Sequence, residues 1–223
     1  MNPGDVLDLA HGRAVAVEVV DPDGAAWAEL HPDERARAAA LAPVRRREWI
    51  AGRRALRRAL TAAGLADAAA LAGVVLAADD RGAPTVPAGA VGSLSHKREL
   101  AVALVAPAAG WTIGVDLEVD RSRGIDIARK VLTAAELAAL DAEGAAGAAR
   151  DRAVILAFAI KEAVYKAIDP HLRRYVGFQE VAVWPDADGA VRVEPLADWG
   201  LDVEAAWRGL GSHLVCTARA RPR

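Results

Sequence analysis

Hydrophobic and polar residues repeat along this chain with two different periods, which predict strands and helices in turn. A period of two indicates a half-buried strand, and a period near 3.6 indicates an amphipathic helix. Strands are expected at 14–20, 73–77, 92–96, 100–106, 111–118, 181–184, 191–194, 203–207 and 213–220. Helices are expected at 33–41, 44–63 and 66–71, from Thr133 onward, and at 149–168. We expect strands 92–96, 100–106 and 111–118 to form a central sheet.

Local signals set the ends of several of these elements. Asp33 is the candidate N-cap of the first helix. Thr133 followed by Glu136 is a capping-box pattern. Pro170 is expected to end helix 149–168, because proline removes a backbone N–H and disfavours helical continuation.

This mixture of elements predicts an α/β (α+β) fold. With 223 residues, of which 53% are hydrophobic, the chain can bury the core of one large domain or of two small packed halves. We divide it into an N-terminal half, 1–108, and a C-terminal half, 109–223. Because the sequence shows no internal repeat, any two-fold organisation would be structural only.

Composition narrows the functional classes. A formal net charge of −2 argues against general nucleic-acid binding. No stretch is long and uncharged enough to span a membrane, and the N-terminus lacks the features of a signal peptide. The chain contains one cysteine, Cys216, so an internal disulfide is impossible and a cytoplasmic location is expected.

Two acidic residues close the predicted strand 111–118. Residues two apart in a strand point to the same side, so Asp116 and Glu118 present two oxygen ligands from one face. Two neighbouring carboxylates in a buried strand repel each other unless a cation or a proton intervenes. Although charged residues are also common at strand ends, this pair predicts half of a divalent-cation site.

A second charged group lies on the predicted helix 149–168. Glu162 and Lys166 are four residues apart and are therefore neighbours on the helix surface, and Lys161 adds an ammonium on an adjacent face. Metal and lysine together suit a phosphate-bearing substrate, because Mg²⁺ commonly bridges protein carboxylates to substrate phosphates. The ordinary structural explanation is a helix-stabilising Glu–Lys pair.

Arginine interrupts the apolar stripe of helix 44–63. Arg53 falls on this stripe, and Arg46 and Arg57 lie close to it. An inward-facing arginine needs either an anionic partner or a packed stem whose charged end reaches water.

A polar cluster, Ser93-Leu94-Ser95-His96-Lys97, lies at the end of strand 92–96. Strand alternation places Ser93 and Ser95 on one side and His96 on the other, unless the strand ends at Ser95. The cluster is either a set of donors to a phosphate or a polar strand end. A hydrolase triad is disfavoured, because the chain lacks the G-x-S-x-G nucleophile elbow.

Taken in order, four motifs resemble the 4′-phosphopantetheinyl transferase superfamily in its longer monomeric class, which includes the surfactin-synthetase-activating and enterobactin-synthesis enzymes. The motifs are Gly52-Arg53, Ser93-Leu-Ser-His96, Gly114-Val-Asp-Leu-Glu118 and Phe158-x-x-Lys161-Glu162-Ala163-x-x-Lys166. The resemblance implies a pseudo-dimer of two similar α/β halves, with coenzyme A and Mg²⁺ in the cleft between them. It also implies a cytoplasmic monomer that activates carrier proteins, often in secondary metabolism such as siderophore biosynthesis.

The resemblance also assigns roles in the C-terminal half. Asp116, Glu118 and Glu162 match the family's metal ligands. Lys161 and Lys166 match positions that flank the coenzyme A pyrophosphate, and Lys166 is the better candidate for direct contact and for catalysis.

In the N-terminal half, the implied roles concern the nucleotide end of coenzyme A and its 3′-phosphate. Arg53 matches the arginine of the family's G-R element, and Ser95 and His96 match its S-H element. Arg46 is a weaker candidate for the same substrate.

The implied reaction is attack by a serine hydroxyl of an apo acyl or peptidyl carrier protein on the β-phosphate of coenzyme A, with release of 3′,5′-ADP. The base is either Glu162 or a metal-bound water, and the sequence does not choose between them. Two alternatives use the same residues: a Mg²⁺-dependent phosphohydrolase acting on nucleotides, and a non-catalytic module that binds coenzyme A or carrier proteins.

Overall fold

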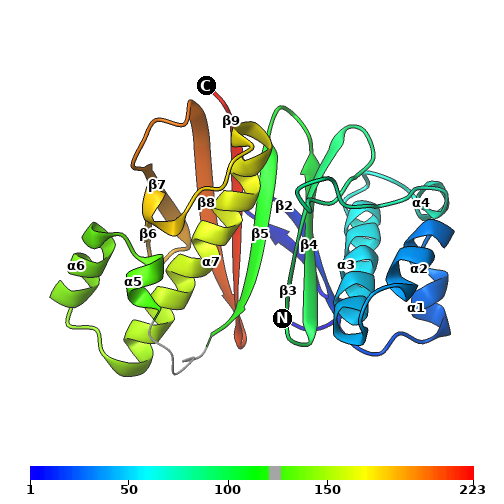
Figure 1. Cartoon of the computed structure of the whole chain (residues 1–223), viewed down its shortest axis with the longest axis horizontal. Coiled ribbons are helices and arrows are strands. Elements are labelled where there is room, and N and C mark those ends of the chain that lie inside the picture. Colours follow the sequence, from blue (N-terminus) through cyan, green and yellow to red (C-terminus); the bar gives the residue numbers. More distant parts are fainter. Residues whose placement is uncertain (121–126) are drawn as a thin grey trace. The chain divides into compact units, whose positions relative to one another are not determined.

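The computed structural model describes residues 1–120 and 127–223 (Figure 1). The chain forms two compact units, Met1–Ile113 and Gly114–Arg223. Each unit contains a sheet with antiparallel strand pairs and one long helix packed against it, which confirms the predicted fold class. The division into domains at 108 and 109 stays a prediction. Within the described residues, no helix is both long and apolar enough to cross a membrane.

The first unit is built on a four-stranded antiparallel sheet with the strand order β1-β2-β4-β3. Its strands are β1 (Val6–Leu9), β2 (Gly12–Glu18), β3 (Ala90–Lys97) and β4 (Leu100–Pro107). Its helices are α1 (Gly24–Ala28), α2 (Pro32–Ala39), α3 (Pro43–Ala62) and α4 (Ala68–Ala72). The long helix α3 packs on β2, β3 and β4, as Figure 1 shows.

The second unit is built on a five-stranded sheet with the strand order β5-β9-β8-β7-β6. Its strands are β5 (Thr112–Val119), which begins at the boundary between the units, β6 (Val181–Pro185), β7 (Ala190–Pro195), β8 (Leu201–Leu210) and β9 (His213–Pro222). Its helices are α5 (Ala128–Val131), α6 (Ala134–Ala142), α7 (Gly147–Leu172) and the 3₁₀ turn η1 (Phe178–Glu180). Helix α7 packs on β6, β8 and β9 (Figure 1).

The long helices follow from their sequences. Helix α3 begins at Pro43, where the missing N–H has no helical partner to lose. It buries Leu56 and Leu60 against Val15 and Val17 of β2. Helix α7 is rich in alanine, the strongest helix former, and it buries a continuous face of small and branched residues.

Pro170 does not end helix α7, which corrects the prediction. The helix continues to Leu172, and Arg173 then takes the left-handed conformation with φ 47°. Its N–H donates to the carbonyl of Asp169. A proline this close to the helix end removes one backbone donor without interrupting the helix, since few hydrogen bonds remain to be made beyond it.

The predicted central sheet of strands 92–96, 100–106 and 111–118 is wrong as a unit. The first two predicted strands are β3 and β4 of the first sheet, whereas β5 belongs to the second sheet and neighbours β9. Adjacent strands in a sequence usually pair, and here the chain departs from that tendency.

The strand predicted at 73–77 is also absent. Two of its backbone groups are bonded to side chains instead: the carbonyl of Val74 accepts from Arg57, and the N–H of Leu76 donates to Glu34. A segment with its polar groups bonded in this way does not need a neighbouring strand.

Candidate active site

Gly114 allows β5 and α7 to approach each other more closely than any other residue would. A Cβ atom built on Gly114 would lie 1.9 Å from the carbonyl oxygen of Ala163 and 2.9 Å from the backbone nitrogen of Ala167. Real Cβ atoms do not make contacts this short, so a side chain at this position would separate the strand from the helix. The glycine therefore brings the acidic end of β5 next to the charged turns of α7.

Asp116 and Glu118 are buried at 6% and 3% exposure, side by side on β5. The Lys166 ammonium donates to Asp116 Oδ1 over 2.8 Å and to the carbonyl of Val115 over 2.8 Å. The structure therefore joins the strand carboxylates to the helix, as the sequence predicts. Lys166 thus forms an ion pair with Asp116 on the strand.

Glu162 interacts electrostatically with the same group of residues. Burial raises the pKa of Glu162, Lys166 lowers it, and the carboxylates of Asp116 and Glu118 raise it again. The net effect is a pKa above the ordinary value of a glutamate. Three carboxylates and one ammonium thus influence one another within a partly buried region of the second unit.

This donor set fits a divalent cation by its chemistry. Mg²⁺ prefers oxygen ligands, and a cation would relieve the repulsion that contributes to the raised pKa of Glu162. Within residues 1–120 and 127–223, no group of three or more His, Cys, Asp or Glu side chains is already arranged to hold a metal ion. Instead, the Lys166 ammonium lies against Asp116.

Lys161 has a different environment from the one the sequence predicts. Its side chain is buried at 2% exposure. The ammonium donates to Glu136 Oε2 over 2.6 Å and to the carbonyls of Val131 and Phe178 over 2.8 and 2.9 Å. These three acceptors use the three ammonium protons, so Lys161 has no proton left to donate to a phosphate.

The first unit contains a pocket of about 430 Å³. It is lined by the C-terminal part of α2, one face of α3, the end of β3 and a loop that follows α4. Three of the predicted substrate-binding residues, Arg53, Ser95 and His96, contribute to its wall. The structure therefore gathers residues that are more than forty positions apart in the sequence.

Arg53 is the most unusual cation in this pocket. It is 4% exposed, and its guanidinium lies 4.7 Å from the centre of the Trp49 ring. Its Nε atom is buried and has no hydrogen-bond partner among the described residues. Burial lowers its pKa to about 10, an effect that Glu34 opposes and three nearby arginines reinforce. An anion in the pocket would satisfy both the charge and the buried donor.

Ser95 and His96 both line the pocket, although they are consecutive in a strand that continues to Lys97. His96 Nε2 lies 2.9 Å from Glu48 Oε2 and 3.1 Å from Arg45 Nη1. Arg45 Nη1 also contacts Glu48 Oε2 over 3.3 Å. This small network fixes the imidazole at the pocket wall.

Arg46, the weaker candidate from the sequence, is not among the residues that line the pocket. Its Nε donates to the carbonyl of Ala38 over 3.1 Å, and its Nη2 donates to those of Ala39 and Leu41 over 3.1 and 3.0 Å. These are carbonyls at and beyond the C-terminus of α2, where the regular hydrogen bonds of the helix run out. Arg46 therefore caps α2.

Sequence reasoning missed other residues of the pocket. Arg37, Arg45 and Glu48 line it, together with the loop residues Asp79 and Asp80. Arg45 lies eight residues, about two turns, before Arg53, so extending the arginine stripe would have found it. Glu48 lies off that stripe, since five residues separate it from Arg53. No comparable signal marks the loop.

The family comparisons agree in both units. Residues 112–218 match the model of the 4′-phosphopantetheinyl transferase superfamily, and residues 31–106 match that of the 4′-phosphopantetheinyl transferase N-terminal domain. The 4′-phosphopantetheinyl transferase Npt of Nocardia iowensis is 33% identical over 177 residues, which cover 75% of each chain.

Solved structures with a similar fold cover about half of the chain. The holo-(acyl-carrier-protein) synthase of Bacillus anthracis in complex with CoA is 22% identical, with a TM-score of 0.41, and covers 50% of this chain and 96% of its own. The apo-ACPS structure of Chronobacterium ammoiniagenes is 20% identical, with a TM-score of 0.41, and covers 51% and 97%.

The contact at Gly114 can be tested by substitution. Gly114→Ala is expected to lower the free energy of unfolding by about 1–3 kcal/mol, because the added methyl group must displace the backbone of α7. Urea unfolding followed by circular dichroism measures the change. Gly209→Ala is the matched control, since its Cβ would meet no heavy atom within 4 Å. If both variants are equally stable, β5 and α7 do not approach each other as described.

Proposed function

Since this chain belongs to the 4′-phosphopantetheinyl transferase superfamily and is a phosphopantetheinyl transferase, we propose that it moves the phosphopantetheine group of coenzyme A to a serine of an apo acyl or peptidyl carrier protein in a Mg²⁺-dependent reaction. The second product is 3′,5′-ADP. The observation that carries this proposal is the convergence of Asp116, Glu118, Glu162 and Lys166 where β5 meets α7.

We assign the metal to the three carboxylates of this cluster. Asp116, Glu118 and Glu162 would hold Mg²⁺, which supplies charge neutralisation for the pyrophosphate when bound. Lys166 neutralises further phosphate charge from the same side of α7. Its present partner, Asp116, shows that its ammonium reaches the strand carboxylates.

The proposed transfer is a displacement at phosphorus. The serine oxygen of the carrier forms a bond to the β-phosphorus, and the bond from that phosphorus to the bridging oxygen breaks. The leaving 3′,5′-ADP keeps the electron pair of that bond, and the serine proton passes to a base, for which Glu162 is our protein candidate. The protein contributes alignment and electrostatic stabilisation rather than a covalent intermediate.

We assign the nucleotide end of coenzyme A to the pocket of the first unit. Arg53 offers a buried cation with an unused donor, and Ser95 and His96 add polar groups at the same wall. A pocket of about 430 Å³ is in the range of small-molecule sites. We assign Arg53 to the 3′-phosphate, because a phosphate would pair with its positive charge and accept a hydrogen bond from its unused Nε–H.

Intact-mass analysis of carrier proteins tests the proposed activity. Apo fatty-acid, polyketide and peptide-type carriers are incubated with the enzyme, coenzyme A and Mg²⁺, with and without a chelator. A chelator-sensitive gain of one phosphopantetheine group is the expected result. Phosphate or nucleotide release without a carrier would favour the phosphohydrolase, and coenzyme A binding with no mass gain on any carrier would favour the binding module.

The same class of enzyme suggests three further properties. We propose that the protein is a monomer, that it works in the cytoplasm, and that its carriers belong to secondary metabolism such as siderophore biosynthesis.

Substitution of the carboxylates tests the metal assignment. Asp116→Ala and Glu162→Ala are each expected to lower kcat/KM for transfer on the order of 10²–10³-fold, because each removes a ligand of the metal that would neutralise the pyrophosphate. Glu143→Ala, which removes an exposed carboxylate after α6, is the control and should leave the rate unchanged. Near-normal turnover in either site variant would refute the assignment.

Lys166 has two explanations, which its removal separates. If it contacts phosphate, Lys166→Ala lowers kcat at saturating Mg²⁺ by about 10²-fold, with the fold retained by circular dichroism. Lys130→Ala, at an exposed position in α5, is the control. An unchanged kcat would show that Lys166 only pairs with Asp116 and does not contact phosphate.

The 3′-phosphate assignment predicts a loss of discrimination. Arg53→Met should raise KM for coenzyme A by about 10–100-fold, because a charge-assisted hydrogen bond contributes about 1.5–3 kcal/mol. It should leave the KM for dephospho-coenzyme A, which lacks the 3′-phosphate, nearly unchanged. Arg47→Met is the control, because Arg47 lies on the same helix as Arg53 and pairs with Asp21 outside that helix. Equal losses with both substrates would place Arg53 away from that phosphate.

A further inference from the structure

Each unit of the chain contains a buried ion pair built from the same parts. A glutamate at the third position of a short helix completes that helix's capping box, and a cation from the long helix donates to it. We call these two pairs the Glu34–Arg57 lock and the Glu136–Lys161 lock. The residues of each pair are 23 and 25 positions apart in the sequence.

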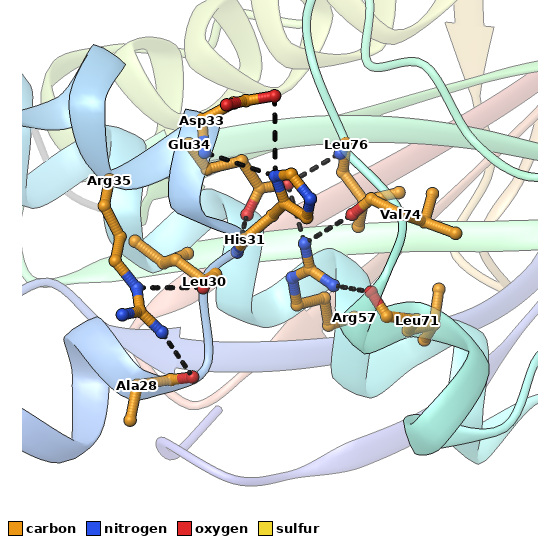
Figure 2. A network of polar contacts seen from close by, with 10 residues as sticks. All are labelled: Ala28, Leu30, His31, Asp33, Glu34, Arg35, Arg57, Leu71, Val74 and Leu76. Atoms are coloured by element: carbon orange, nitrogen blue, oxygen red, sulfur yellow. Dashed lines mark hydrogen bonds and ion pairs between the residues drawn. The ribbon is translucent and has the colours of Figure 1, made fainter.

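The Glu34–Arg57 lock ties α2 and α3 to the segment after α4 (Figure 2). Glu34 Oε1 accepts from Arg57 Nη2 over 2.7 Å and from the N–H of Leu76 over 2.6 Å. Glu34 Oε2 accepts from the N–H of the N-cap His31 over 3.1 Å. Arg57 also donates to the carbonyl of Leu71, and to that of Val74 over 2.8 Å.

The Glu136–Lys161 lock ties α6 and α7 to β6. Glu136 Oε2 accepts from Lys161 Nζ over 2.6 Å and from the N–H of the N-cap Thr133 over 2.6 Å. Glu136 Oε1 accepts from the N–H of Val183 over 2.8 Å. As in the first lock, the cation completes its coordination with two backbone carbonyls, those of Val131 and Phe178.

The second lock controls the turn of α7 that carries Glu162. Lys161 immediately precedes Glu162, and Ala163, which follows it, lies against Gly114. One side of this turn is therefore held by the lock and the other by β5. If α7 rotated or slid along its axis, the buried ion pair would break or the helix backbone would collide with β5. These two contacts therefore fix the position and orientation of the Glu162 backbone relative to Asp116 and Glu118.

The first lock is connected to the nucleotide pocket in the same way. Arg57 lies one helical turn after Arg53, and Glu34 lies one turn before Arg37. Leu76, whose N–H binds Glu34, is two residues before Ala78, where the loop wall of the pocket begins. The lock thus joins the three chain segments that carry these parts of the pocket wall.

Stability alone is a weak explanation for both locks, because a buried ion pair is seldom more stable than apolar side chains of the same volume. We propose that the locks are positioning devices: Lys161 with Glu136 positions the metal carboxylate Glu162, and Arg57 with Glu34 positions the nucleotide pocket. None of the four side chains contacts substrate. This inference rests on the proposed function, since it uses the metal and nucleotide assignments given above.

Two matched double variants test this division of roles. Glu136→Gln/Lys161→Met disables the second lock and Glu34→Gln/Arg57→Met the first, and neither leaves a charge buried alone. Metal binding is measured as Mn²⁺ affinity by electron paramagnetic resonance, with coenzyme A at a concentration that saturates each variant. Nucleotide binding is measured calorimetrically with 3′,5′-ADP in the presence of a chelator. Thermal unfolding reports the structural cost.

We expect each double variant to weaken the binding of one ligand and to leave the binding of the other unchanged. Loss of the second lock should weaken Mn²⁺ binding by about 10–100-fold, the usual cost of removing support behind a metal ligand, with 3′,5′-ADP affinity within about twofold of wild type. Loss of the first lock should weaken 3′,5′-ADP binding about tenfold or more and leave Mn²⁺ affinity within about twofold. Each variant is the control for the other, because both replace a buried ion pair of the same kind, and thermal unfolding compares their effects on stability.

Other outcomes overturn the inference. If either variant weakens both ligands equally, or if neither ligand is affected, the locks only support the fold. If a double variant does not fold, Lys161→Arg and Arg57→Lys, which keep the charge and change its reach, are compared in the same two binding assays. A wild-type protein that binds no Mn²⁺ would overturn the proposed function together with this inference, whereas wild-type binding with an unaffected second-lock variant overturns the inference alone.

Discussion

The backbone of β5 lies so close to α7 at Gly114 that a methyl group there would sit 1.9 Å from the carbonyl oxygen of Ala163. The chemistry of the second unit depends on this approach. A strand presents carboxylates every second residue, and a helix presents charged residues every three or four, so neither element alone gathers three carboxylates. The contact between them does, and the charge that results requires cations, of which Lys166 is one.

Buried cations among residues 1–120 and 127–223 fall into two kinds. Arg57 and Lys161 are each bonded to a buried carboxylate and to backbone carbonyls, so their charges are satisfied within the protein. Arg53 instead packs on the Trp49 ring, keeps a buried donor without a partner among the described residues, and has a lowered pKa. A satisfied cation supports structure, whereas one that burial destabilises at a pocket wall is poised for an anionic ligand.

Sequence periodicity predicted which charged side chains share a face of a strand or a helix. It did not predict contacts between residues that are far apart in the sequence. The faces of Asp116 and Glu118 followed from the strand period, and the proximity of Glu162 and Lys166 followed from the helix period. The ion pair of Lys161 with Glu136 was not predicted, because a motif does not say which of two adjacent charges points inward and Glu136 lies 25 positions away. The pocket loop had no sequence signal, since its approach to the pocket depends on a long-range hydrogen bond from Leu76 to Glu34 rather than on local turn residues.

The most direct test of this account is a crystal structure of the protein with Mn²⁺ and coenzyme A, in which anomalous scattering locates the metal. The account predicts one peak coordinated by Asp116, Glu118 and Glu162 and by oxygens of the coenzyme A pyrophosphate, with Lys166 beside the phosphates. A metal bound elsewhere, or a pyrophosphate held by side chains outside the junction of β5 and α7, would contradict it.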